Sequence, residues 1–328
     1  MNGTRRADSP GRVVSFGQII VDLTIRVERV PQPGEDVYAD RAGVAVGAGF
    51  NALYAVRRMG VDAVYAGALG TGPRADRIRA ALEREGIAHG GVTDREDDNG
   101  LCIALTDADA ERTFVSVRGA ETRLGPHGFD NVAVGAGDVA IFSGYTLIHR
   151  SAEALSAFMR RTAGHDFPAV FDTSPVIGQI TDAQLDELVS YRPIWTCNER
   201  EGGILAERLG LGRTAPQTDN GGLCAALCEA LRAPVVLRAG SGGAWVGSED
   251  GTVEPVPGFP VTAVDTNGAG DCHTGVICAE LCRGADLVRA VRLANAAAAI
   301  AVTRHGPATC PTRGEAEALI ARADEGRR

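Results

Sequence analysis

Apolar and polar residues alternate along this chain in two different rhythms. From residue 139 onward, short apolar runs take turns with longer segments whose apolar residues recur every three to four positions. The apolar runs lie at 139–143, 169–172, 194–197 and 234–238, and the helical segments lie at 151–163, 182–188, 199–209, 223–231, 286–303 and 312–323. Short buried strands that alternate with helices predict a mainly parallel sheet covered by helices.

The first part of the chain departs from this rhythm. A buried strand is expected at 13–20, followed by helices at 52–59 and 74–85. Around 22–46 and 98–118, however, apolar and polar residues alternate in short pieces separated by proline, glycine or aspartate. Such pieces favour antiparallel strands. We therefore expect a small β lid, formed by these two segments, on a larger α/β domain.

Composition is typical of a globular protein. Of 328 residues, 45% are hydrophobic and 23% are charged, and no apolar stretch reaches membrane-spanning length. Residues 1–12 are polar and lack the apolar core of a signal peptide, so we expect a disordered tail there and one domain at 13–328. Eight cysteines without a C-x-x-C pair predict reduced thiols in a cytoplasmic protein that does not act at a membrane.

The charged residues exclude several function classes. The net charge is −9 and no basic block is present, which argues against a nucleic-acid partner. The chain contains no lysine, so all its 33 cationic side chains are arginine. A Walker A loop, a protein-kinase fold and a PLP enzyme each need a lysine. If the protein handles ATP, backbone amides, arginines and metal ions must balance the phosphate charge.

The most distinctive motif is Asp265-Thr266-Asn267-Gly268-Ala269-Gly270-Asp271, which an apolar helical run follows. Small residues at a helix start leave amide groups and the positive end of the helix dipole available to bind an anion. A carboxylate at that place is explained by a general base beside a phosphoryl group. The alternative is an aspartate that merely stabilises the first helical turn.

Other polar residues follow predicted strands or glycine turns. Asp22 follows the first strand, Asn51 follows the glycine loop at 47–49, and Asn198 and Glu201 lie at a strand-to-helix junction. Taken singly, Asp22 is a turn residue, and Asn198 with Glu201 forms a capping box. Taken together, they lie where an open α/β sheet binds its ligands, beyond the carboxyl ends of its strands.

The order of these motifs, together with the stretch at 296–311, resembles the PfkB/ribokinase family of small-molecule kinases over about residues 13–323. The resemblance implies a ribokinase-like three-layer α/β/α sandwich with a mainly parallel central sheet and a β lid over the sugar. It also implies ATP-dependent phosphorylation of a hydroxymethyl group. Asp271 would be the general base, and the amides of Gly268, Ala269 and Gly270 would stabilise the phosphoryl charge.

The same resemblance assigns the binding residues. Asp22, Gly47 and Asn51 would hold the hydroxyl groups of a sugar or nucleoside substrate. Asn198 and Glu201 would organise Mg²⁺ through its waters, with Asn198 beside the nucleotide.

Further along the chain, the resemblance places four residues at the nucleotide. Arg238, Gly240 and Gly243, in the loop after a strand, would lie near the nucleotide, and Asn295 near the adenine. Asp265 and the segment 303–310 resemble a monovalent-cation loop, so K⁺ activation is expected. Because the family often dimerises through open lid strands, a homodimer of that kind is a further expectation.

Two departures from the family pattern narrow the range of substrates that we expect. Ile20 stands where ribokinase has a sugar-binding asparagine, and Ala48 stands where ribokinases often have lysine. Losing two polar contacts argues against free ribose, because unmet sugar hydroxyls are costly. The alternative function is a non-catalytic sugar- or nucleotide-binding regulator on a kinase fold. The presence of Asp271, Asn198 and Glu201 speaks against it.

Overall fold

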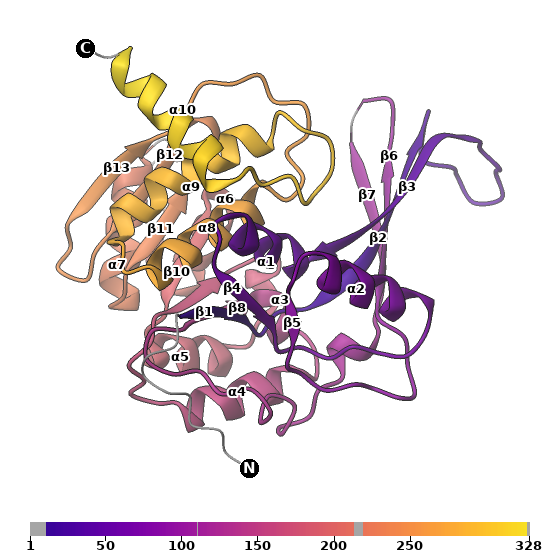
Figure 1. The fold of residues 1–328 in the computed structure, drawn as a ribbon, viewed down its shortest axis with the longest axis horizontal. Helices are drawn as coiled ribbons and strands as arrows, with labels where there is room; N and C mark the ends of the chain where they lie inside the picture. The colour runs from indigo at the N-terminus through magenta and orange to yellow at the C-terminus, as the bar shows by residue number, and fades with distance from the viewer. Residues whose placement is uncertain (1–10, 110, 213–218, 327–328) are drawn as a thin grey trace.

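The computed structural model of the chain describes residues 11–109, 111–212 and 219–326 (Figure 1). Within these ranges the strands form two sheets. In spatial order, the larger sheet contains β13 (Val253–Pro257), β12 (Gly243–Gly247), β11 (Val235–Arg238), β10 (Ile194–Asn198), β9 (Ala169–Asp172), β8 (Val139–Ser143), β1 (Arg12–Ser15), β4 (Asp62–Tyr65) and β5 (Ala88–His89). All pairs from β11 to β5 are parallel, whereas β12 and β13 are antiparallel.

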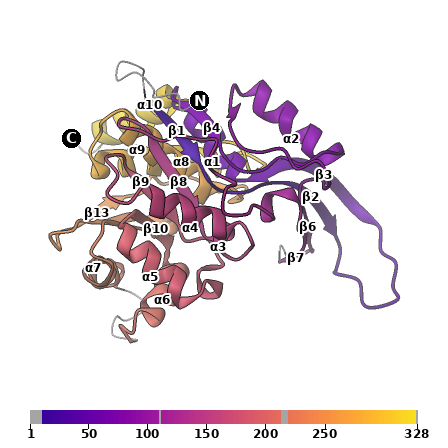
Figure 2. The same ribbon diagram turned by 90° about the horizontal axis from the view of Figure 1, so that it is seen from below.

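Helices cover both faces of this sheet (Figures 1 and 2). One face carries α1 (Gly49–Arg58), α2 (Pro73–Arg84), α8 (Ala269–Cys282), α9 (Leu287–Ala301) and α10 (Arg313–Glu325), and the other carries α3 (Gly144–Leu147), α4 (Ala152–Arg161), α5 (Asp182–Tyr191), α6 (Glu199–Arg208) and α7 (Asn220–Leu231). Neighbouring strand residues alternate between the two layers. Val13 and Ile141 pack in the first core, and Val14 and Phe142 in the second. This arrangement confirms the predicted α/β/α sandwich.

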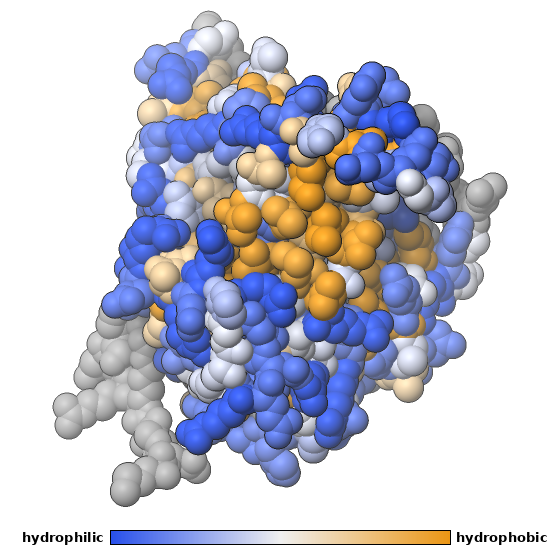
Figure 3. Space-filling model, turned by 90° about the vertical axis from the view of Figure 1, so that its right-hand side faces the viewer, coloured by the Kyte–Doolittle hydropathy of each residue, from blue (hydrophilic) through white to orange (hydrophobic). Residues whose placement is uncertain are grey.

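The second sheet is the lid, with strand order β3-β2-β6-β7. Its strands are β2 (Ile19–Val27), β3 (Ala39–Ala48), β6 (Leu101–Thr106) and β7 (Arg112–Val117). It projects from the larger sheet on the side of α2 (Figure 1). Figure 3 views this side and shows an apolar patch bordered by hydrophilic surface. Among the large apolar side chains exposed on lid strands are Val44, Phe114, Val115 and Val117.

The prediction of one continuous strand at 13–20 is wrong. β1 ends at Ser15, whose hydroxyl accepts a hydrogen bond from the amide of Gly17 at 3.3 Å, and β2 begins at Ile19 in the other sheet. Asp22 therefore lies within a lid strand and does not end a core strand. The apolar run cannot reveal this break, because both strands are buried where they meet.

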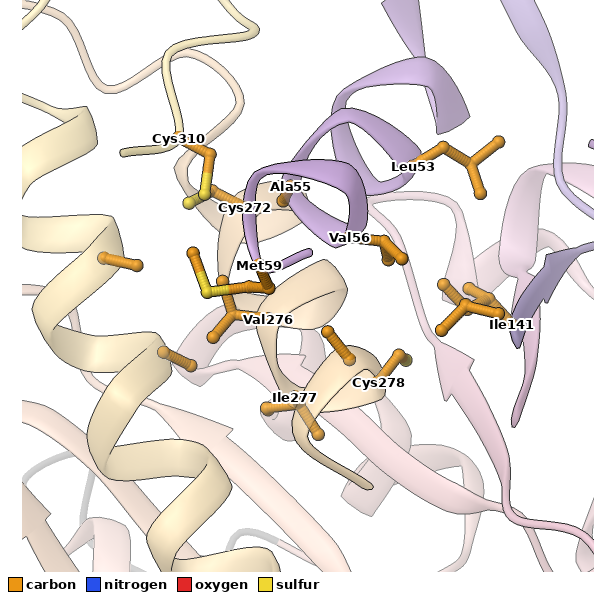
Figure 4. Packing of buried hydrophobic residues seen from close by; sticks show 14 of the residues in the cluster. Leu53, Ala55, Val56, Met59, Ile141, Cys272, Val276, Ile277, Cys278 and Cys310 are labelled. Atoms are coloured by element: carbon orange, nitrogen blue, oxygen red, sulfur yellow. The ribbon is translucent and has the colours of Figure 1, made fainter. Parts of the chain in front are cut away.

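The central helix α8 is fixed by close packing against α1. Figure 4 shows Met59, the C-cap of α1, beside Val276 of α8, in the interior of the first core. A Cβ atom on Gly275 would collide with the carbonyl oxygen of Ala52, so glycine at this position lets the two helices approach. Because α8 cannot shift along α1, the residues at its N-terminus are held in place.

Residues 1–10 of the expected tail lie outside the described residues. Arg12 is already part of β1, and its amide donates to Asp138 Oδ1 at 3.1 Å. In the described ranges, no helix is long and apolar enough to cross a membrane.

Candidate active site

The start of α8 requires a glycine and is not capped by a side chain. Gly268 at the N-cap has a φ of 75°, in the left-handed region, and a Cβ atom there would collide with the carbonyl oxygen of Pro307. No side chain caps this helix. The Ala269 amide donates a long hydrogen bond of 3.3 Å to the Thr266 carbonyl, which an incoming anion could replace. The start of α8 thus has the features of an anion-binding position, namely free amides and the positive end of the helix dipole.

Asp271 lies in the first turn of α8 and is held by α1. Its Oδ2 accepts a hydrogen bond from Asn51 Nδ2 at 2.9 Å. Burial raises the pKa of Asp271 to about 7, against a smaller lowering by the Asn51 bond. Asn51 is itself buried, and its Oδ1 has no partner among the described residues. A carboxyl with this pKa can accept a proton near neutral pH, which is the property of a general base.

Asp22 and Gly47 face the same region from the lid. A Cβ atom on Gly47 would overlap the Asp22 carboxylate, so the carboxylate lies directly over the glycine. Burial raises the pKa of Asp22 to about 6. Asp22 also contributes to the raised pKa of Asp271, which indicates that the two carboxyls face a common space. Lid and core thus each supply one carboxyl group, Asp22 and Asp271, and the two interact electrostatically.

Three adjacent parallel strands end in polar residues near the start of α8. Asp172 ends β9, Asn198 ends β10 and Arg238 ends β11. The Arg238 guanidinium contacts Asp172 Oδ2 at 3.0 Å and Glu201 Oε2 at 3.3 Å. Thr274 of α8 donates to the same Asp172 oxygen at 2.8 Å. We call these four residues, Asp172, Glu201, Arg238 and Thr274, the ion cluster.

The ion cluster lies immediately beneath the start of α8. A Cβ atom built on Gly270 would be 3.6 Å from Cζ of Arg238. The Arg238 side chain is only 13% exposed. Its burial alone would lower the pKa of Arg238, but the carboxylates of Asp172 and Glu201 raise it. The guanidinium therefore stays charged and places one buried cation under the anion-binding position.

Asn198 and Glu201 form the capping box that was the structural alternative for this pair. Asn198 Oδ1 accepts from the Glu201 amide at 2.9 Å, and Glu201 Oε2 accepts from the Asn198 amide at 3.0 Å. Glu201 is 3% exposed and also accepts from Thr173 Oγ1 at 3.0 Å. Both residues are thus committed to protein partners. Within the described ranges, no group of three or more acidic, histidine or cysteine side chains could hold a metal directly.

Asp265 joins the motif to the segment 303–310. Its Oδ1 accepts from the Asn267 amide at 2.9 Å, and its Oδ2 accepts from the Gly306 amide at 3.0 Å. The carboxylate therefore fixes two loops relative to the start of α8.

The other residues predicted to bind the nucleotide differ in their exposure to solvent. Gly240 is exposed in the turn after β11 and has a φ of 53°, whereas Gly243 is buried at the start of β12 and has a φ of 97°. Asn295 is buried: its Oδ1 bonds His273 Nε2 at 2.9 Å, and its Nδ2 donates to the Val256 carbonyl at 2.9 Å. A direct hydrogen bond from Asn295 to a ligand would require these contacts to break.

Two members of the ion cluster escaped the sequence analysis. Asp172 is the last residue of a strand that the apolar pattern did predict. Its position at the carboxyl end of that strand could have identified it as a candidate site residue. Thr274 follows Asp271 by three residues and thus shares its helix face. The pairing of Arg238 with Asp172 and Glu201 joins residues 66 and 37 positions apart and has no local signal.

Comparison with known proteins gives a consistent result. Residues 11–313 match the pfkB family carbohydrate kinase profile. The chain is 34% identical, over 304 residues, to the uncharacterized sugar kinase YegV of Escherichia coli, with 92% of each chain covered.

Solved structures share the architecture. The ribokinase from Thermotoga maritima aligns with a TM-score of 0.80 at 23% identity and covers 94% of this chain and 99% of its own. An Arabidopsis thaliana ribokinase complexed with ribose and ATP aligns with a TM-score of 0.75 at 20% identity, covering 95% and 99%. At these identities the likeness establishes the fold.

Proposed function

Because the chain belongs to the pfkB family of carbohydrate kinases, we propose that it transfers the γ-phosphoryl group of ATP to a hydroxymethyl group of a sugar or nucleoside-like substrate. Membership of this family sets aside the non-catalytic alternative. The observation that carries the proposal is the Asp271 carboxyl, which is bonded to Asn51, has a pKa of about 7 and adjoins an uncapped helix start.

The proposed reaction follows from these positions. Asp271 removes the proton of the acceptor hydroxyl, and the acceptor oxygen forms a bond to the γ-phosphorus as the bond to the β-phosphate oxygen breaks. The amides of Gly268, Ala269 and Gly270 face the charge on the transferred group. Arg238 adds a buried positive charge below them. The products are the phosphorylated acceptor, ADP and a proton held by Asp271.

Mg²⁺ fits this site through water and the nucleotide phosphates. Asn198 and Glu201 are bonded to each other and to the ion cluster, so they would hold waters of the ion and not the ion itself. When bound, the ion neutralises phosphate charge. K⁺ would bind at Asp265 and the segment 303–310, the two parts that the Asp265–Gly306 bond joins.

The acceptor is proposed to carry hydroxyls that Asp22 and Asn51 can bind. Ile20 lies on the same face of β2 as Asp22, because alternate residues of a strand share a face. Ala48 has a φ of 55° at the N-cap of α1 and offers no polar group. A wall with less polar contact than ribokinases use supports a substrate other than free ribose.

An acceptor panel tests this function. ADP formation would be measured with Mg²⁺ and ATP over pentoses, hexoses, ketoses and nucleosides, with Asp271→Asn as the control. Turnover of at least one acceptor that depends on Asp271 is the expected result. The proposal fails if no acceptor is phosphorylated, or if Asp271→Asn turns over as fast as the wild type.

Gly47→Ala is expected to lower kcat/KM for the acceptor by roughly 10²-fold, since the new methyl group would displace the Asp22 carboxylate. The KM for ATP should stay close to wild type. Gly43→Ala is a matched control in the same strand, because its Cβ would meet only Thr24 Oγ1, at 3.2 Å. Equal losses in both variants would contradict the placement of Asp22 at the acceptor.

The pH dependence of kcat/KM should report Asp271. A general base works only when deprotonated, so activity is expected to fall as the pH drops through about 7, the pKa of Asp271. A second loss near pH 6 is expected from protonation of Asp22. Initial rates between pH 5 and 9 would measure this, with thermal unfolding at each pH as the control. A profile that stays flat down to pH 5 would argue against Asp271 as the base.

A further inference from the structure

A separate pocket of about 390 Å³ lies where the lid joins the core. Its walls come from β3, the start of α1, one face of α2 and the loop at 305–309. Val44, Phe50 and Pro307 supply apolar surface, and Arg77, Arg84 and His305 supply polar groups. Its size falls within the usual range for small-molecule sites.

This pocket is distinct from the proposed acceptor cleft. Asp22 and Gly47 share one face of the lid, because a Cβ on Gly47 would meet the Asp22 carboxylate. Val44 and Val46 point to the opposite face of β3, since neighbouring residues of a strand alternate. β3 is an edge strand of the lid, and the loop at 305–309 passes beside it. Ala45, on the Gly47 face, also lines the pocket, but the pocket walls on α2 and the loop at 305–309 contain none of the residues assigned to the acceptor.

The charge of the pocket contrasts with that of the chain. The protein carries a net charge of −9, yet the residues that line this pocket include two arginines and a histidine and no carboxylate. Arg84 has a neighbouring carboxylate, Glu85, at 3.1 Å. Arg77 makes no ion pair with any residue in the described ranges. Its guanidinium is thus available to an external anion.

We propose that this pocket binds a small phosphorylated metabolite, with the phosphate group between Arg77 and Arg84 and the body of the molecule against the apolar wall. A planar guanidinium matches the oxygens of a phosphate with two parallel hydrogen bonds. His305 offers a further nitrogen at the rim. Val44, Phe50 and Pro307 contact the non-phosphate part.

The pocket is positioned to influence the proposed active site. Its loop contains Pro307, whose carbonyl adjoins Gly268, and Gly306, whose amide bonds Asp265. Its strand contains Val44, three residues before Gly47. A bound metabolite would therefore contact both the lid and the loop that holds the start of α8. Binding of a metabolite in this pocket does not depend on the kinase reaction. A failure to bind would therefore leave the proposed function intact, and a lack of kinase activity would leave the pocket proposal intact.

Calorimetric titration of the full chain with inorganic phosphate, glucose and glucose 6-phosphate tests the site. A non-hydrolysable ATP analogue at saturating concentration keeps phosphate out of the start of α8. Phosphate and glucose 6-phosphate are expected to bind the wild type. Their affinity for Arg77→Gln or Arg84→Gln should be at least about tenfold weaker. Arg322→Gln, an exposed arginine on α10, is the matched control and should bind as the wild type does.

Several outcomes would overturn the proposal. One is that neither phosphate nor glucose 6-phosphate binds the wild type. Another is that Arg77→Gln and Arg84→Gln bind these compounds as tightly as the wild type does. A third is that adding the ATP analogue abolishes binding. Equal weakening in Arg322→Gln would show that net charge alone attracts the anion. Arg77 and Arg84 are exposed, and thermal unfolding of each single variant verifies that it is folded.

Discussion

Asp271→Asn is expected to reduce kcat by roughly 10²–10⁴-fold, the contribution typical of general acid–base catalysis. The substitution keeps the size of the side chain and an oxygen that can accept the 2.9 Å hydrogen bond from Asn51. Acceptor and nucleotide affinities should therefore remain close to wild type. Steady-state kinetics, together with equilibrium binding of ATP and of the acceptor identified by the panel, would separate the two effects. A loss confined to binding would contradict the role of Asp271 as base.

The same variant has a second readout in stability. The pKa of Asp271 is about 7 in the folded protein against an ordinary value of 3.8, so its ionisation opposes folding. This destabilisation is absent below pH 4, grows as the pH rises and is complete above pH 7. The difference corresponds to roughly 4 kcal/mol at most, and partial solvent access reduces it.

Asp271→Asn should therefore raise the free energy of unfolding at pH 8 and leave it almost unchanged at pH 4. Urea unfolding at the two pH values measures this. A variant that is equally stabilised at both values would show that Asp271 ionises normally. The stabilisation at pH 8, paired with lost activity, is the pattern expected when a residue is retained for function at a cost in stability.

Arg238→Met is expected to lower the free energy of unfolding by about 3–5 kcal/mol, the usual result of removing one partner from a buried ion pair. Glu201 is 3% exposed and Asp172 is 17% exposed, so water cannot replace the lost cation. Urea unfolding at pH 7.5 measures the change. Arg192→Met is a matched control, because Arg192 pairs with Glu249 where both side chains are more than half exposed. We expect it to cost less than about 1 kcal/mol.

Arg238 also has an electrostatic effect on Asp271 that a purely structural residue would not have. Its charge lowers the pKa of Asp271, against the larger effect of burial. In a variant that still folds, such as Arg238→Lys, the charge is retained and the pH profile should stay near that of the wild type. In Arg238→Met the midpoint should move to higher pH. Identical midpoints in the two variants would rule out this electrostatic effect.

In this chain without lysine, the buried positive charge near the start of α8 comes from an arginine. Arg238 has five donors in a rigid plane, and it uses them on Asp172, Thr196, Thr274 and Glu201. Lysine has a single charged nitrogen and could not bridge the ends of β9 and β10 to α8 in this way. The arginine thus connects β9, β10, α6 and α8 while placing its charge under the start of α8.

Local sequence patterns determined much of this protein. Apolar runs at 139–143 and 169–172 predicted buried parallel strands, because a strand covered by helices on both faces must be apolar throughout. The glycines at 268 and 270 marked the start of α8, and at 268 only a residue without Cβ fits beside Pro307. The capping box of Asn198 and Glu201 at the start of α6 could also be predicted, since it involves residues three positions apart.

Tertiary structure alone decided the rest. Asp22 belongs to a lid strand because the chain changes sheets after Ser15, and two buried strands in succession look like one apolar run. Arg238 lies in the ion cluster because β9, β10 and β11 end side by side, which brings together charges far apart in sequence. The raised pKa of Asp271 arises from burial between α1 and the lid. Hydrophobic periodicity records which residues are buried, whereas desolvation and charge pairing depend on distances that only the folded chain fixes.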